Sequence, residues 1–286
     1  MKRHPLNRVL FVAFIFVPII SILVPISSSG LTVHKSRLYF VGVGPAGPDL
    51  ATLQAIDVIK QADVIFAPTF IQNAFNEYLK GKDVRIAWPD SIYKVGGKSY
   101  TALETEEEKR ILMRAIREHA SDLADQFKKE MTQNKSVALL VNGDPCLFSD
   151  LRWFKQYFRN EDFEVIPGMS SFNAGAALFK AELTPQQQGL NTVIIYSPIS
   201  EPSGGTIRKL AKHQATMVFF MAGNLKYAVN ELKKEYGGNT PIAVAYFIGY
   251  PEKQKVIKGT LNTILRDTGS EPEKEMLLIY VGDFMK

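Results

Sequence analysis

Cysteine is almost absent from this sequence of 286 residues, which contains only Cys146. A single cysteine excludes a disulfide bond within the chain, and it also excludes a metal site built from several thiolates. Cys146 follows a Gly-Asp-Pro turn and could therefore lie near a ligand. We nevertheless expect a small, buried, apolar thiol, because free cysteine is among the residues most often found in protein interiors.

Long tracts of one charge are absent as well. The net charge is +5, but basic residues at the start of the chain contribute part of it, and elsewhere lysine and glutamate are interspersed, as in 104–109. Without a basic tract, binding to nucleic acid is not indicated. The positive balance would suit a substrate with several carboxylates, although an ordinary solvated surface accounts for it more simply.

The sequence also lacks the residue sets that several enzyme classes require. There is no Ser/His/Asp or Cys/His set of a hydrolase, and there is no Walker phosphate loop. His119 lies on the apolar stripe of a helix predicted over 101–131, where we expect a packed structural histidine rather than a ligand. The glutamates at 104 and 106–108 would form a solvated first turn that complements the helix dipole, so no metal site is predicted.

Residues 1–30 differ in character from the rest of the chain. Lys2, Arg3 and Arg8 precede an uncharged run, and this run is strongly apolar over 9–26. Basic charge before an apolar run is typical of a signal peptide or an uncleaved membrane anchor. Because the basic charge would remain in the cytoplasm, we expect the folded part to be membrane-associated or exported. The alternatives are a buried helix of the domain and an ordinary cytoplasmic location.

A strand, a tight turn and a helix are predicted around Pro167 and Gly168. An apolar run ends at Pro167, and Gly168 permits the chain to turn because it has no Cβ. Ser170 or Ser171 would then cap a helix that continues to about Lys180. Unpaired N–H groups at the start of such a helix suit a small polar ligand.

Two further strands run into turns rich in glycine and proline. The first turn, Gly-Val-Gly-Pro, spans 42–45, and the second, Asn-Gly-Asp-Pro, spans 142–145. In an open α/β sheet, ligands bind at the carboxyl ends of the strands, so three such turns predict one shared crevice. A dinucleotide site is not expected, because no acidic residue follows the strand that ends at Phe66.

The alternation of apolar runs and helical patterns predicts an α/β protein with two domains. The N-terminal α/β domain would span 37–183 and the C-terminal α/β domain 190–286, because Pro185 and neighbouring glutamines break the pattern at 182–188. Asp49 is the expected cap of the first helix. The predicted strands are 37–43, 63–66, 137–141, 163–166, 192–196, 216–221, 241–247, 254–258 and 275–281. The predicted helices include 49–60, 149–158, 225–236 and 261–266. We expect the last strand to close the second sheet.

The ordered set of Gly-x-Gly-Pro, Gly-Asp-Pro and Pro-Gly-x-Ser-Ser turns resembles the tetrapyrrole methylases, and the resemblance covers 37–284. Within this family, 216–222, 258–261 and 277–284 resemble the C-11 methyltransferases that act on precorrin-4 or cobalt-precorrin-4. The resemblance implies two α/β domains with the methyl donor S-adenosylmethionine in the cleft between them. It also implies a tetrapyrrole substrate, C-methyl transfer and a homodimer.

The same resemblance implies which residues line the donor site. They are Pro45, Asn142, Gly143, Asp144, Leu147, Ser170, Ser171, Met221, Ala222 and Ala243. Asp144 has a second interpretation, as an acceptor for amide groups of its own turn. Met221 and Ala222 could instead pack in the core at the end of a strand. No catalytic residue is predicted, because Pro68 stands where uroporphyrinogen-type members carry an acid and methyl transfer depends mainly on orientation.

The N-terminal segment conflicts with the usual setting of this family, because the methyl donor is made in the cytoplasm. The leading hypothesis is an S-adenosylmethionine-dependent C-methyltransferase for a corrinoid precursor or another tetrapyrrole. The alternative is an exported, membrane-tethered tetrapyrrole-binding protein that has lost methyl transfer. Methylation of a protein or RNA is a third and weaker alternative, since the same fold serves those substrates in relatives.

Overall fold

The computed structural model describes residues 37–99, 103, 105–186, 189–197, 205–221, 224–269 and 276–285. The segment 1–30, predicted as a signal peptide or membrane anchor, lies outside these residues. Among the described helices, none is both long and apolar enough to cross a membrane. The described residues all belong to one compact unit.

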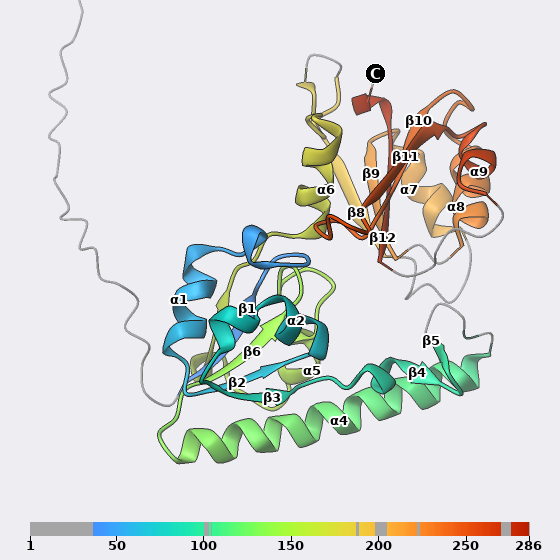
Figure 1. Cartoon of the computed structure of the whole chain (residues 1–286). Helices are drawn as coiled ribbons and strands as arrows, with labels where there is room; N and C mark the ends of the chain where they lie inside the picture. The colour runs from blue at the N-terminus through green and yellow to red at the C-terminus, as the bar shows by residue number, and fades with distance from the viewer. Residues whose placement is uncertain are drawn as a thin grey trace, which may run out of the picture. The chain divides into compact units, whose positions relative to one another are not determined.

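Five parallel strands make up the first sheet, in the order β3-β2-β6-β1-β7 (Figure 1). Their bounds are β1 Leu38–Gly42, β2 Val64–Ala67, β3 Asp83–Ile86, β6 Val137–Val141 and β7 Phe163–Ile166. Every residue of β1, β2 and β6 is buried, as their continuous apolar runs require in a sheet covered on both faces. The predicted strands 137–141 and 163–166 are confirmed at both ends.

Helices cover both faces of the first sheet. They are α1 Leu53–Gln61, α2 Thr69–Ala74, α3 Asn76–Leu79, α4 Glu106–Thr132 and α5 Leu151–Phe154. Successive side chains of a strand point to opposite faces. Tyr39 and Val41 of β1 therefore pack with α1, α2 and α3, whereas Leu38 and Phe40 pack with α4 and α5.

The first helix begins later than the sequence pattern predicted. Asp49 lies in a separate short turn, η1 Pro48–Leu50, and α1 begins only at Leu53. Thr52 is its N-cap, because its side-chain oxygen accepts a hydrogen bond from the Ala55 amide at 3.1 Å. The prediction that Asp49 caps this helix is therefore wrong.

The long helix α4 also begins later than predicted, at Glu106 instead of 101. Thr105 and Glu108 form a reciprocal capping box, which sets this start. The expected apolar stripe is confirmed, since Leu112, Ile116, Leu123 and Phe127 are all buried. His119 lies half-buried on it, with Nε2 at 2.5 Å from the Ala87 carbonyl oxygen, and is a structural residue as predicted.

The second sheet has five strands in the order β11-β10-β12-β9-β8. Their bounds are β8 Val193–Tyr196, β9 Thr216–Phe220, β10 Pro241–Tyr246, β11 Lys255–Thr260 and β12 Leu277–Val281. Only the β8–β9 pair is parallel among these pairings. The last strand, β12, lies between β10 and β9 instead of closing the sheet at an edge, which corrects the sequence-based expectation. Its five buried residues explain why it occupies the centre.

Helices also pack on both faces of the second sheet. Their bounds are α6 Ser171–Phe179, α7 Thr206–Ala211, α8 Leu225–Leu232 and α9 Ile264–Asp267. α6 contributes Ala174 and Phe179 to one apolar cluster, and the other three helices contribute to the opposite cluster. Asn224 caps α8 through its side-chain oxygen, as predicted. The boundary at 182–188 stays a prediction, although the two sheets fall on either side of it.

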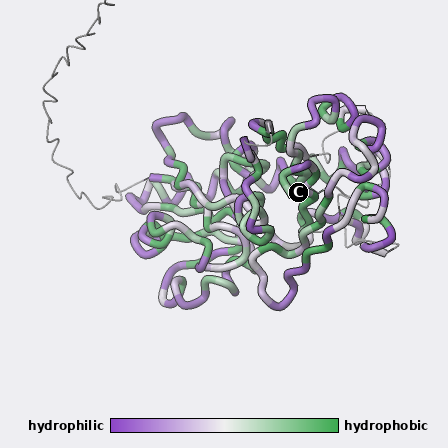
Figure 2. Tube along the Cα trace, turned by 90° about the horizontal axis from the view of Figure 1, so that it is seen from above, coloured by the Kyte–Doolittle hydropathy of each residue, from purple (hydrophilic) through white to green (hydrophobic). Residues whose placement is uncertain are grey.

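Several short elements complete the described chain. They are η2 Asp90–Tyr93, the hairpin of β4 Lys94–Val95 and β5 Lys98–Ser99, η4 Asn160–Asp162 and η7 Asp283–Met285. The trace in Figure 2 shows hydrophobic segments, in green, gathered in the interior and hydrophilic segments, in purple, along the outer parts of the chain. The strands of each sheet therefore supply the packed core.

Candidate functional site

The three glycine-rich turns meet at one edge of the first sheet. They follow β1, β6 and β7, which are neighbours in the order β6-β1-β7 and run parallel. Gly44 donates its amide to the Gly143 carbonyl at 3.3 Å, and Gly143 donates to the Gly44 carbonyl at 3.0 Å. The predicted convergence of the three turns is confirmed.

Glycine is required where two of these turns touch. A Cβ built at Gly42 would lie 2.6 Å from both the Gly168 nitrogen and Pro145 Cδ. A Cβ built at Gly168 would overlap the Gly143 carbonyl oxygen and lie 2.7 Å from the Gly42 carbonyl carbon. Since these neighbours are mostly backbone atoms, they cannot move aside cheaply, and only glycine permits the approach.

Asp144 organises the turn after β6. Its Oδ1 accepts a hydrogen bond from the Cys146 amide at 2.9 Å, so the interpretation as an acceptor for turn amides is confirmed. Asn142 beside it is exposed, and the face of Gly143 is open, because a Cβ there would meet nothing within 4 Å. Cys146 is also exposed, and the prediction of a buried thiol is wrong because the turn projects the residue away from the core.

The turn after β7 leads directly into α6. Ser170 is the N-cap residue and is buried, and the helix runs from Ser171 to Phe179, close to the predicted end. The Ser170 side chain makes no capping hydrogen bond, although its carbonyl accepts the amides of Asn173 and Ala174. The start of α6 is therefore held by contacts other than its own cap.

The second sheet contributes two of the predicted residues that the structure describes, Met221 and Ala243. Ala243 is fully buried in β10 and belongs to the same apolar cluster as Leu147, which follows the β6 turn. Met221 follows β9 and is 36% exposed, so its alternative placement in the core is wrong. Ala222 lies outside the described residues.

Backbone strain marks the same region, and the sequence did not indicate it. Ala46, Phe148 and Met221 have φ values of 70°, 49° and 48°, which side-chain-bearing residues rarely adopt. Phe148 is 43% exposed, and its ring centroid lies 5.1 Å from that of Phe220. Strained residues of this kind concentrate at ligand sites. No sequence signal reveals them, because the strain is imposed by the contacts between elements.

A carboxyl group near the same sheet edge was also missed. Asp150 follows the β6 turn, and Tyr93 donates its hydroxyl hydrogen to Asp150 Oδ1 at 3.3 Å. Burial raises the pKa of the Asp150 carboxyl to about 6. Among the described residues no group of three or more histidine, cysteine, aspartate and glutamate side chains could hold a metal ion.

The comparison with known families decides what these turns belong to. The model of the Tetrapyrrole (Corrin/Porphyrin) Methylases matches residues 37–265, which include the first sheet and all strands of the second sheet except β12. The chain belongs to this family. It is therefore a tetrapyrrole methylase, and the resemblance inferred from the three turns is confirmed. Matches to relatives extend over nearly the same part of the chain.

Individual relatives agree with the family assignment. The chain is 28% identical over 262 residues to a cobalt-precorrin-4 C(11)-methyltransferase of Methanocaldococcus jannaschii, covering 88% of this chain and 89% of the relative. It is 27% identical over 255 residues to a precorrin-4 C(11)-methyltransferase of Pseudomonas aeruginosa, covering 87% and 90%. A solved structure of a cobalt precorrin-4 methyltransferase superposes with a TM-score of 0.67 at 23% identity, covering 88% of this chain and 96% of that one.

The methyl donor of this family is S-adenosylmethionine, and the described turns fit such a ligand. Asn142 is exposed, and a Cβ built at Gly143 would meet nothing within 4 Å, so a ligand has room at this turn. Met221, which follows β9, is also exposed. The donor carries its methyl group on a positively charged sulfonium. When the methyl group is transferred, the rest of the donor leaves as a neutral thioether. The protein's task is consequently to bind and orient, and a strong acid or base is not required for departure of the thioether.

Proposed function

We propose that this tetrapyrrole methylase transfers a methyl group to C-11 of a precorrin-4-type substrate. The observation that carries the proposal is the meeting of the turns at 42–45, 142–145 and 167–171 on one sheet edge. The relatives named for C-11 transfer on precorrin-4 or cobalt-precorrin-4 support the choice of substrate. The net charge of +5 is compatible with a polycarboxylate ring.

The donor-binding role of the individual residues is part of this proposal. The exposed Asn142 side chain, the Gly143 backbone and the half-buried Ser171 would bind the polar parts of the donor, and Leu147 and Met221 would bind its apolar parts. Pro45, Asp144, Ser170, Ala222 and Ala243 complete the proposed set. In the reaction, a bond forms between the substrate carbon and the methyl carbon while the methyl–sulfur bond breaks in line with it.

A direct assay tests the proposal. The full-length chain, purified in mild detergent, is incubated with S-adenosylmethionine and either precorrin-4 or cobalt-precorrin-4. We expect a product heavier by one methyl group, with uroporphyrinogen III as the comparison substrate. Preferential methylation of uroporphyrinogen III would contradict the choice of substrate. Binding of precorrin-4 or cobalt-precorrin-4 in the absence of any methyl transfer would favour the alternative function.

The alternative is an exported, membrane-tethered protein that binds a tetrapyrrole without methylating it. The observation that favours it is the basic and apolar sequence of 1–30. We propose that this segment is a signal peptide or membrane anchor and that the folded part lies outside the cytoplasm. A cytoplasmic location with active methyl transfer is the competing outcome.

We also propose that the chain consists of two domains, which span 37–183 and 190–286. We further propose that the chain forms a homodimer. Light scattering at micromolar concentration measures the mass directly. A monomer mass would refute the dimer and leave the proposed reaction unaffected.

A further inference from the structure

We infer that Tyr280 is a positioning residue for the methyl-donor site, acting from the second sheet on the first turn of α6. The inference rests on the proposed function, because it takes the start of α6 as part of the donor site. Tyr280 lies in β12, the central strand, and is fully buried. Its hydroxyl donates to the Phe172 carbonyl at 2.9 Å and lies 3.5 Å from the Ser171 carbonyl.

Gly175 provides the space through which this hydroxyl reaches α6. A Cβ built at Gly175 would overlap the Tyr280 hydroxyl and lie 2.9 Å from Tyr280 Cζ and 2.8 Å from Ile248 Cδ1. Glycine weakens a helix interior relative to alanine, so its presence in the middle of α6 requires a packing reason. The approach of the Tyr280 side chain supplies that reason.

The tyrosine side chain is held in one place and keeps its proton. The Phe179 ring packs edge-on against the Tyr280 ring with centroids 4.7 Å apart, so both ends of α6 contact the same side chain. Burial raises the pKa of the Tyr280 hydroxyl, which therefore stays a hydrogen-bond donor at neutral pH. The Tyr280 hydroxyl is therefore preorganised as a hydrogen-bond donor, and it has little freedom to follow a shift of α6.

Contacts from both sheets thus fix the position of the start of α6. On the side of the first sheet, Gly168 packs directly against Gly42 and Gly143. On the side of the second sheet, the contact is the Tyr280 hydroxyl, while the Ser170 side chain makes no cap bond. Removing the hydroxyl leaves the turn contact intact but releases the helix start. We therefore expect an effect on donor affinity beyond the loss of stability.

Tyr236 offers a matched control in the same half of the chain. It is also a buried tyrosine whose hydroxyl donates to a backbone carbonyl, that of Ala215, and it packs in the opposite apolar cluster from α6. Tyr236→Phe and Tyr280→Phe thus remove equivalent hydrogen bonds. A purely structural role would make the two variants behave alike.

The experiment measures donor affinity and thermal midpoint for the full-length chain and both variants. Calorimetry uses S-adenosylmethionine and S-adenosylhomocysteine, so that no tetrapyrrole is needed. We expect both variants to unfold at a lower temperature and only Tyr280→Phe to raise the Kd, by about three- to tenfold. An unchanged Kd in Tyr280→Phe, or an equal rise in Tyr236→Phe, would overturn the inference while leaving the proposed function standing. Absence of donor binding by the wild type would sink both.

A second pair of variants tests the contact itself. Gly175→Ala keeps the Tyr280 hydroxyl but displaces it, and we expect this change also to raise the Kd. If both residues act through one contact, the Gly175→Ala/Tyr280→Phe double variant raises the Kd by less than the product of the single increases. Equality with that product would show independent effects and would contradict the inference.

Discussion

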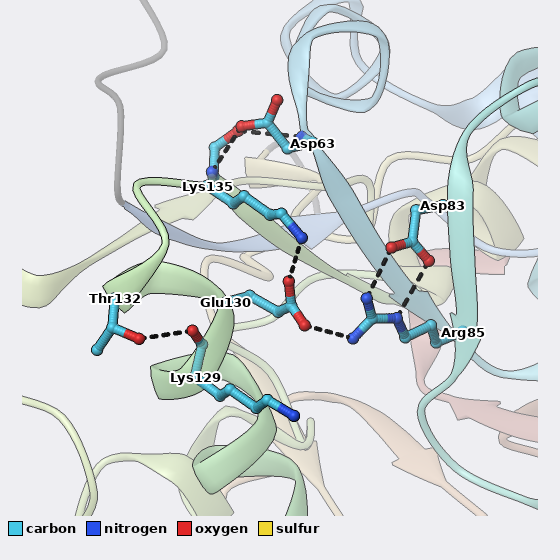
Figure 3. Close-up of polar contacts among 8 residues, drawn as sticks. Asp63, Asp83, Arg85, Lys129, Glu130, Thr132 and Lys135 are labelled. Carbon is cyan, nitrogen blue, oxygen red and sulfur yellow. Dashed lines mark hydrogen bonds and ion pairs between the residues drawn. The ribbon is translucent and has the colours of Figure 1, made fainter.

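At the residue scale, Glu130 shows how a buried charge is stabilised in this fold. Its side chain lies at the end of α4, and the residue is only 5% exposed. Oε1 accepts from Arg85 at 2.8 Å and Oε2 accepts from Lys135 at 2.6 Å (Figure 3). Arg85 also binds Asp83, so the group links β3, the end of α4 and the start of β6.

The Glu130 pairings predict a pH-dependent stability. The hydrogen bond from Lys135, and then that from Arg85, lowers the pKa of the Glu130 carboxyl below its ordinary value of 4.5. A carboxyl with a lowered folded-state pKa stabilises the protein above its unfolded-state pKa, and this contribution is lost as the pH falls through the folded-state value. Glu130→Gln should therefore cost about 1–2 kcal/mol at neutral pH. The difference from wild type should shrink below a pH of about 4.5. Urea unfolding across this range measures it.

Glu107→Gln is the matched control for this prediction. Glu107 pairs with Arg110 on the same helix, but both side chains are more than two-thirds exposed. An exposed pair of this kind contributes little to folding free energy. Because Glu107 lies in the first turn of α4, its charge also complements the helix dipole, and we expect Glu107→Gln to cost about 0.3–1 kcal/mol at neutral pH, less than Glu130→Gln. Equal losses in the two variants would show that burial does not strengthen the Glu130 pairing.

Asp144 carries the second prediction at this scale. Asp144→Ala removes the acceptor for the Cys146 amide and should weaken binding of S-adenosylmethionine by roughly 1–3 kcal/mol. Asp144→Asn is the control, because its amide oxygen can still accept the same hydrogen bond. Calorimetry on both variants distinguishes a role in turn geometry from a role of the negative charge. Equal weakening in both variants would assign the effect to the charge.

At the scale of elements, the packing of one turn against another contributes more to folding stability and donor binding than the conformation of either turn alone. Gly168→Ala would place a Cβ against the backbone of Gly42 and Gly143, and relief of this overlap must move whole turns. We expect a loss of about 1–3 kcal/mol in the free energy of unfolding, together with weaker donor binding. Gly47→Ala is the control in the neighbouring turn, since a Cβ there meets nothing within 4 Å. Urea unfolding in which both variants matched wild type would disprove the tight contact.

At the scale of the whole molecule, we propose that the segment 1–30 determines where in the cell the protein works. We predict that it directs the chain to the membrane, because basic residues precede the apolar run at 9–26. Replacing Phe14 and Ile15 with arginine should oppose insertion by about 5–7 kcal/mol and release the protein to the cytosol. Fractionation of cells expressing both forms measures this. Recovery of the full-length wild-type chain in the cytosolic fraction would refute the prediction.

The sequence by itself determined the elements that depend on local chemistry. The continuous apolar run of β6 predicted that strand to the residue, because a strand buried on both faces tolerates few polar side chains. The edge strand β7, which contains Glu164 and is mostly half-buried, was also predicted to the residue, because it ends at the Pro-Gly turn. The glycine and proline turns predicted both the shared sheet edge and the family, because close backbone approach requires those residue types. The Asn224 cap was predictable because its hydrogen bond is local and reaches only to the amide three residues later.

Only the tertiary structure decided the features that depend on distant partners. Asp49 and Thr52 are both competent caps, and the turn at 48–50 selected Thr52. The apolar run of β12 indicates that the strand is buried, but which strands flank it was decided by its pairing with β9 and β10. The exposure of Cys146, the strained φ of Phe148 and the reach of Tyr280 to α6 follow from packing between elements. These contacts join residues far apart in the chain, so no local pattern could reveal them.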